Sequence, residues 1–89
     1  MIKQSLTIIN KLGLHARAAT KLTSVASRFS CHITLSTKDK TVDCKSVMSL
    51  MLLAASKGTD IEIHTDGRDE IEAMDAVVGL IHNRFDEAE

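Results

Sequence analysis

The sequence contains no tryptophan, tyrosine or proline, and its two phenylalanines are Phe29 and Phe85. Proteins that bind single-stranded nucleic acid stack its bases on aromatic side chains, and this chain lacks such a platform. Its core must instead be built from leucine, isoleucine, valine, methionine and alanine. Without proline, the glycines Gly13, Gly58 and Gly67 mark most of the turns.

The chain has no marked excess of one charge, because 11 basic and 12 acidic residues leave a formal net charge of −1. Binding to a phosphate backbone needs a clustered basic excess, so nucleic acid is excluded as the main partner. The longest apolar run, residues 50–55, has six residues, whereas a membrane span needs roughly 18. The first residues also lack the apolar region of a signal peptide. We therefore expect a cytoplasmic protein that does not insert into a membrane.

Two cysteines, Cys31 and Cys44, are too few for a disulfide framework. In a cytoplasmic protein we expect them to be buried free thiols. The histidines His32, His64 and His82 have no spacing that resembles a metal site. The sequence therefore predicts neither a disulfide nor a bound metal.

With 89 residues, of which 44% are hydrophobic, the sequence is expected to form a single domain over residues 1–89. Alternation of apolar and polar residues predicts strands, and apolar residues at helical spacing predict helices. The predicted strands cover residues 3–9, 31–36, 42–44 and 61–66, and the predicted helices cover 16–28, 47–55 and 70–85.

These elements follow the order βαββαβα. Four strands with one apolar and one polar face need a single covering layer of helices. The predicted fold class is therefore α+β, an open-faced two-layer sandwich whose four-stranded antiparallel sheet is covered on one side by three helices. Ser46 is expected to cap the second helix and Gly58 to end it. The acidic residues 86–89 are expected to fray.

His15 lies where a loop containing Gly13 meets the start of a helix. The unpaired N–H groups and positive dipole of a helix start attract anions and disfavour a charged imidazolium, which leaves a neutral nucleophile. Histidine can accept a phosphoryl group covalently, and the planar donors of Arg17 can neutralise phosphate oxygens. On local physics alone, a histidine at a helix N-terminus is more often a surface residue or a cap, and an arginine such as Arg17 is more often a solvated helix charge.

Three motifs carry a resemblance to a known family. The segment Gly-Leu-His-Ala-Arg-Ala-Ala at residues 13–19 resembles the active-site segment of HPr, the histidine phosphocarrier family of the bacterial phosphotransferase system. The resemblance continues at residues 45–51 and 55–59 and extends over essentially the whole chain. Ala18 departs from the family, in which most members have proline there to preset the helix start. Because alanine is the best helix former, we expect no loss of phosphotransfer.

The resemblance implies a mechanism. HPr proteins accept a phosphoryl group derived from phosphoenolpyruvate from phosphorylated enzyme I and pass it to a histidine of a IIA-type protein. His15, through its Nδ1 nitrogen, matches the acceptor, and Arg17 matches the partner of the phosphate. The resemblance thus implies a monomeric carrier without a cofactor, rather than a free-standing enzyme.

Other positions match further functions of the family. Ser46 matches a regulatory serine that an ATP-dependent kinase modifies in some members, although its role as a helix cap is by itself enough to account for a serine here. Val47, Met48 and Met51 lie on a helix that is apolar nearly all round, so part of its surface should be exposed for a partner. The resemblance implies that this helix and the first helix, with Thr20 and Ser24, dock both the donor and the acceptor.

Residues 10–13, 51–53 and 85–87 look more like the nitrogen-related branch of the family, NPr, than the sugar-transport branch. A sugar-branch HPr that feeds carbohydrate permeases is the first alternative. The second is a regulatory binding module whose affinity for a target is switched by phosphorylation of His15. The third is a small α+β interaction domain with an incidental histidine.

Overall fold

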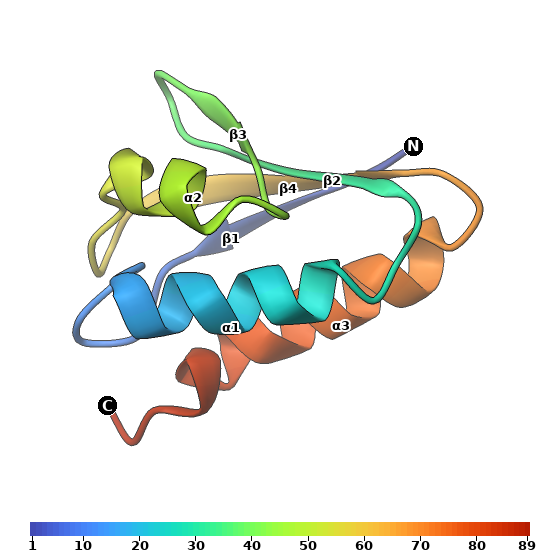
Figure 1. Cartoon of the computed structure of the whole chain (residues 1–89). Helices are drawn as coiled ribbons and strands as arrows, with labels where there is room; N and C mark the ends of the chain where they lie inside the picture. Colours follow the sequence, from blue (N-terminus) through green and yellow to red (C-terminus); the bar gives the residue numbers. More distant parts are fainter.

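Four strands and three helices alternate along the chain in the predicted order (Figure 1). The computed structural model describes all of residues 1–89. The elements are β1 (Ile2–Thr7), α1 (Ala16–Ala26), β2 (His32–Ser36), β3 (Thr41–Asp43), α2 (Val47–Leu53), β4 (Asp60–Asp66), α3 (Glu70–His82) and a short 3-10 turn, η1 (Arg84–Asp86).

The strands form one sheet in the order β1-β4-β2-β3, and every neighbouring pair is antiparallel. Figure 1 shows α1 and α3 side by side along one face of this sheet, with α2 packed beside α1 and close to β3. The predicted α+β fold class, with three helices over an antiparallel sheet, is therefore confirmed. None of these helices is both long and apolar enough to cross a membrane.

The core lies between the sheet and the helices. In β4, Ile61 and Ile63 are buried while Glu62 and His64 between them are half exposed, as the alternation predicts. The buried face of α1 consists mainly of small side chains, which let this helix lie close to its neighbours. The buried residues of α1 are Ala18, Ala19, Leu22 and Ala26.

The two cysteines are buried free thiols, as predicted. Burial is the main cause of a raised pKa at both Cys31 and Cys44, and the nearby charge of Asp43 adds to it at Cys44, where the pKa reaches about 12. Both thiols are therefore protonated at neutral pH, which makes them unreactive parts of the core.

The second helix ends earlier than predicted. It stops at Leu53, and Ala54 then takes a left-handed backbone conformation with φ of 53°. Gly58 does not end the helix but lies in the following turn, where its N–H donates to the Ile8 carbonyl. The reason is tertiary: the carbonyl of the buried Ala55 must face the loop before α1, where it accepts from the Leu14 N–H at 2.8 Å.

The acidic end of the sequence packs against the protein, and the prediction that residues 86–89 fray is wrong. Phe85 is fully buried and anchors this segment. The Lys11 N–H donates to the Glu89 carbonyl at 2.8 Å, and the Lys11 ammonium lies 3.2 Å from the Glu89 carboxylate. A buried aromatic and a backbone hydrogen bond thus hold a segment whose composition alone suggests a mobile tail.

Candidate functional site

His15 occupies the N-cap position of α1, which is the position that the sequence predicts. Its backbone is extended, with φ of −76° and ψ of 179°, and its carbonyl accepts from the Ala19 N–H at 2.8 Å. The imidazole makes no capping hydrogen bond to the helix. The ring therefore stands at the positive end of the helix and is available for chemistry.

The loop before His15 is held by a buried amide. Asn10 is fully buried, and its Nδ2 donates to the Gly13 carbonyl at 2.8 Å and to Glu87 Oε1 at 2.9 Å. Gly13 has φ of +65°, and a Cβ there would lie only 2.5 Å from the Ala55 carbonyl oxygen. This close approach explains why glycine precedes the helix start.

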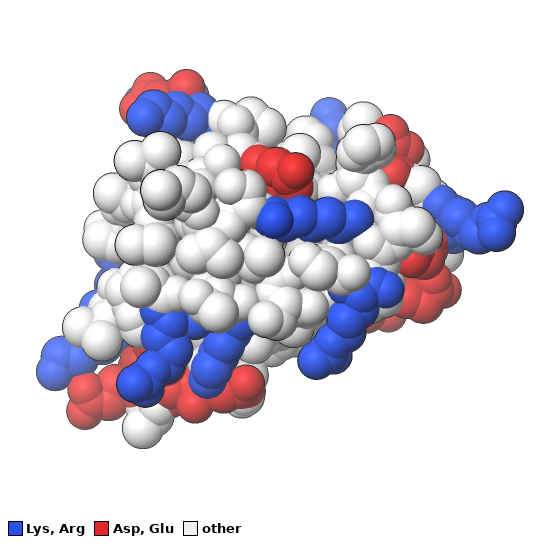
Figure 2. Space-filling model, in the orientation of Figure 1, with Lys and Arg blue, Asp and Glu red and all other residues white.

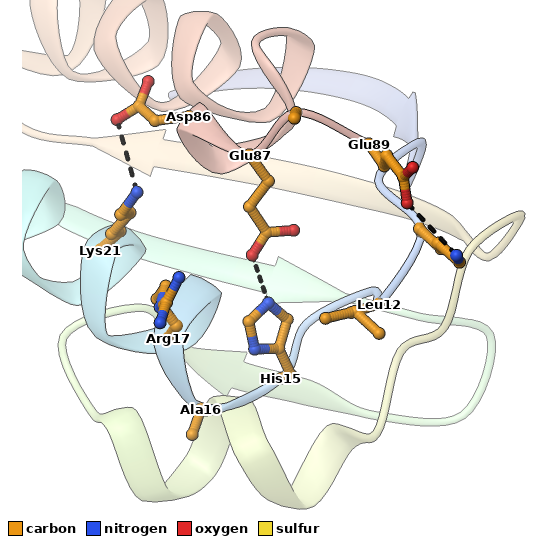
Figure 3. A pocket seen from close by; sticks show the side chains of 10 residues that line it. Leu12, His15, Ala16, Arg17, Lys21, Asp86, Glu87 and Glu89 are labelled. Atoms are coloured by element: carbon orange, nitrogen blue, oxygen red, sulfur yellow. Dashed lines mark hydrogen bonds and ion pairs between the residues drawn. The ribbon is translucent and has the colours of Figure 1, made fainter.

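Glu87 is the residue of the site that sequence reasoning missed. Its Oε2 forms a hydrogen bond and ion pair with Nε2 of His15, as Figure 3 shows. The Glu87 side chain is 13% exposed and that of His15 is 28% exposed. The two residues are 72 positions apart, and no local pattern links them. His15 Nδ1 makes no hydrogen bond within the protein.

The carboxylate of Glu87 is favoured over its protonated form. Desolvation opposes ionisation, but the hydrogen bonds from Asn10 and His15 and the charges of His15 and Lys21 outweigh it, so its pKa lies below the ordinary value. Glu87 is therefore a hydrogen-bond acceptor at neutral pH.

A surface hollow of about 800 Å³ surrounds His15, lined by residues of the loop, α1 and the C-terminal segment. Lys11 is paired with Glu89, and Lys21 donates to the Phe85 carbonyl at 2.9 Å and lies 3.9 Å from Asp86. The guanidinium of Arg17 has neither a hydrogen bond nor an ion pair, and Figure 3 shows it beside His15. Arg17 is thus the cation of the hollow that is free to bind an anion.

The residues expected to dock partners lie on α1 and α2, which pack against each other. Thr20 and Ser24 are exposed on α1. On α2, Met48 is 72% and Met51 is 43% exposed, whereas Val47 is half-buried. Figure 2 shows a largely uncharged surface over α2 and the neighbouring part of α1, with lysine and arginine side chains along its lower edge.

Ser46 caps α2, as predicted. Its Oγ accepts from the Ser49 N–H at 3.2 Å, and its carbonyl accepts from the Leu50 N–H at 3.1 Å. The side chain is half-buried.

Comparison with known proteins agrees with this geometry. The family model described as the PTS HPr component phosphorylation site matches residues 2–83. The phosphocarrier protein HPr of Pseudomonas putida is 54% identical over 90 residues, covering all of both chains. The phosphocarrier protein NPr of Shewanella violacea is 42% identical over 87 residues, covering 98% of this chain and 96% of the relative.

Solved structures show the same fold. A crystal structure of HPr from Thermoanaerobacter tengcongensis superposes with a TM-score of 0.95 at 39% identity and covers all of both chains. A structure of an HPr dimer from the same organism has a TM-score of 0.78 at 40% identity and covers 98% of this chain and all of that chain. The chain therefore belongs to the HPr family of the phosphotransferase system, whose members are phosphocarriers and not enzymes.

Proposed function

We propose that the protein accepts a phosphoryl group on Nδ1 of His15 from an enzyme I-type donor and passes it to a IIA-type protein. The observation that carries this proposal is the state of the imidazole ring. Its Nε2 is occupied by Glu87, while Nδ1 is unpartnered at the start of α1, beside the unpaired Arg17. Membership of the HPr family supports the same assignment.

The transfer is a displacement at phosphorus. The lone pair on Nδ1 attacks the phosphorus of the phosphorylated donor, the bond between phosphorus and the donor breaks, and its electron pair stays with the donor. The reaction involves no other change of covalent bonds. Its rate is therefore controlled by the positioning of the reacting groups and by stabilisation of the charge on the phosphoryl group. In this proposal Arg17 and the free N–H groups of the first turn of α1 bind the phosphoryl oxygens.

The donor and the acceptor dock, in this proposal, on one surface formed by Thr20 and Ser24 of α1 and by Val47, Met48 and Met51 of α2. An exposed apolar patch of this kind is typical of a protein contact surface. Methionine suits a surface that must meet two different proteins, because its side chain adapts to either. We propose that residues 1–89 act as one monomeric carrier domain in the cytoplasm.

Two branches of the phosphotransferase system are candidates. The nitrogen-related branch is supported by residues 10–13, 51–53 and 85–87, and the first and last of these segments supply Asn10 and Glu87, which are hydrogen-bonded at the site. The sugar-transport branch is supported by the identities, since the Pseudomonas putida HPr is 54% identical and the Shewanella violacea NPr is 42% identical.

The test is phosphorylation from phosphoenolpyruvate with purified enzyme I of the nitrogen and sugar types, in parallel. We expect intact mass to show one phosphoryl group that is acid-labile, absent from His15→Ala and retained in His32→Ala, a control at an exposed histidine of β2. The faster donor assigns the branch. Phosphorylation of a folded His15→Ala variant would overturn the assignment. If neither donor phosphorylates the wild-type protein, a regulatory module that acts by contact is favoured instead.

Ser46 is proposed as a second, regulatory site of phosphorylation. A phosphate at the start of α2 would place charge at a helix N-terminus and within the docking surface. Incubation with an HPr-type serine kinase and ATP, followed by intact mass of the wild type and of Ser46→Ala, tests it. An unchanged mass leaves Ser46 as a helix cap only.

A further inference from the structure

The carboxylate of Glu87 is held between two partners from the other end of the chain. Its Oε1 accepts from Asn10 Nδ2 at 2.9 Å, and its Oε2 is bound to Nε2 of His15. Because Asn10 is fully buried and also holds the Gly13 carbonyl, the position of the carboxylate is tied to the loop that carries His15. The contact is therefore built into the site and is not a loose pairing of surface charges.

A strained turn directs Glu87 to this position. Arg84, Phe85 and Asp86 have φ of 55°, 53° and 63°, a left-handed conformation that is costly for residues with a side chain. The burial of Phe85 and the hydrogen bond from Lys21 to its carbonyl hold this conformation. Runs of strained backbone persist where the surrounding structure enforces them, and they cluster at functional sites.

The hydrogen bond to Glu87 selects one form of the imidazole. An ionised carboxylate only accepts hydrogen bonds, so Nε2 of His15 must carry the hydrogen. In the neutral ring, Nδ1 is then the nitrogen with the lone pair. The other charged groups that line this hollow are Lys11, Arg17, Lys21, Asp86 and Glu89.

We propose that Glu87 is the positioning residue of the phosphoryl transfer: it holds His15 in the Nε2–H form and balances the positive charge that the ring gains when Nδ1 bonds to phosphorus. The Nδ1–P bond forms, the bond between phosphorus and the donor breaks with its electron pair left on the donor, and Nε2 keeps its proton. In the onward step a nitrogen of the acceptor's histidine bonds to phosphorus while the Nδ1–P bond breaks and its electron pair returns to Nδ1. The leaving group is then a neutral imidazole instead of an imidazolate anion, so Glu87 assists both transfers.

This inference rests on the proposed transfer at His15. Two variants separate the hydrogen bond to Nε2–H from the negative charge that balances the ring. Glu87→Gln keeps an oxygen that can accept from Nε2–H but removes the negative charge, whereas Glu87→Ala removes both. Glu89→Gln is the matched control, because Glu89 lies in the same hollow, pairs with Lys11 and forms neither a hydrogen bond nor an ion pair with His15.

The first measurement is the ¹⁵N chemical shifts of the two His15 ring nitrogens in the neutral ring. We expect the Nε2–H form to dominate in the wild type and in Glu89→Gln, and a mixture with the Nδ1–H form in Glu87→Ala. A purely structural role of Glu87 would not move this ratio. An unchanged ratio in a folded Glu87→Ala protein would overturn the proposal without a phosphoryl donor being used at all.

The second measurement is the rate of phosphoryl transfer to and from His15. We expect a loss of roughly 10-fold or more in Glu87→Gln, a larger loss in Glu87→Ala and a change of less than about twofold in Glu89→Gln, as for other orienting partners of functional histidines. Wild-type rates in both Glu87 variants would refute the inference and leave His15 as the acceptor. Faster transfer in the Glu87 variants would also refute the inference, because it would mean that Glu87 inhibits transfer at His15. The proposed function itself would fail on different results: a wild-type protein that accepts no phosphoryl group, or a folded His15→Ala variant that still accepts one.

Discussion

Gly13 shows how a single residue decides the geometry of the site. Its backbone has a positive φ, and the space that a side chain would need is filled by the backbone of Ala55 and Ser56. The neighbouring Leu14 N–H bonds the Ala55 carbonyl, so the loop before His15 cannot move aside without loss of that bond. The close approach of two backbones therefore places the imidazole.

We predict that Gly13→Ala destabilises the protein by about 1–3 kcal/mol, because it combines positive-φ strain with a backbone clash. The measurement is urea unfolding. Gly79→Ala is the control with the opposite sign: Gly79 lies within α3 with nothing near its missing Cβ, so alanine should stabilise by about 0.5–1 kcal/mol. Equal stability of Gly13→Ala and the wild type would contradict the role given to this loop.

At the level of elements, Asp69 links the start of α3 to the chain just before β2. It is the N-cap residue of α3, but its side chain makes no capping hydrogen bond to that helix. One carboxylate oxygen accepts from the Ser30 N–H at 2.9 Å, and the other accepts from the Cys31 N–H at 2.9 Å. The Ser30 N–H is the main reason that the pKa of Asp69 falls to about 2, with Cys31 adding to it against an opposing effect of desolvation.

A lowered pKa in the folded state means that ionised Asp69 stabilises the fold. This contribution is complete above the ordinary pKa of 3.8 and is lost as the pH falls toward about 2. We predict that Asp69→Asn unfolds at a lower urea concentration than the wild type at pH 7, and that the difference shrinks between pH 4 and pH 2. Asp75→Asn, at an exposed position of α3, should show no such change. A difference that stays constant with pH would mean that the charge of Asp69 does not stabilise the fold.

The molecule as a whole presents its histidine site and its uncharged surface on neighbouring elements. Helix α1, which begins directly after His15, packs against α2, which carries the exposed Met48 and Met51. A protein that docks over His15 would therefore cover this surface as well. The arrangement suits a carrier that meets each partner by the same face.

We predict that Met48→Asp lowers the rate of transfer from the donor, because it places a charge in the apolar contact surface. The expected loss is on the order of 10-fold, which corresponds to one well-buried contact of about 1.4 kcal/mol. The control is Ile71→Asp on α3, since Ile71 is 62% and Met48 is 72% exposed. The measurement is the rate of phosphoryl transfer to each variant, after urea unfolding has shown that the two are equally stable. If both variants lose the same rate, the proposed docking surface is wrong.

The sequence alone determined the order of the elements, the fold class, and the position of His15 and Arg17 at a helix start. These features are local, because strand alternation, helical spacing and a capping serine are all set by residues close together in the chain. The strand and helix ranges predicted from it agree with the structure to within three residues at every end, and the largest difference is at the end of α3.

Only the tertiary structure decided the early end of α2, the packing of the C-terminal segment and the contact of Glu87 with His15. Each depends on groups far apart in the chain: the Ala55 carbonyl meets the Leu14 N–H, and Glu87 meets a histidine 72 positions away. The composition of residues 86–89 suggests a mobile tail, because three of these four residues are acidic. The packing of Phe85 into the core brings the Glu87 carboxylate to His15, and this long-range contact makes that one acidic residue part of the site.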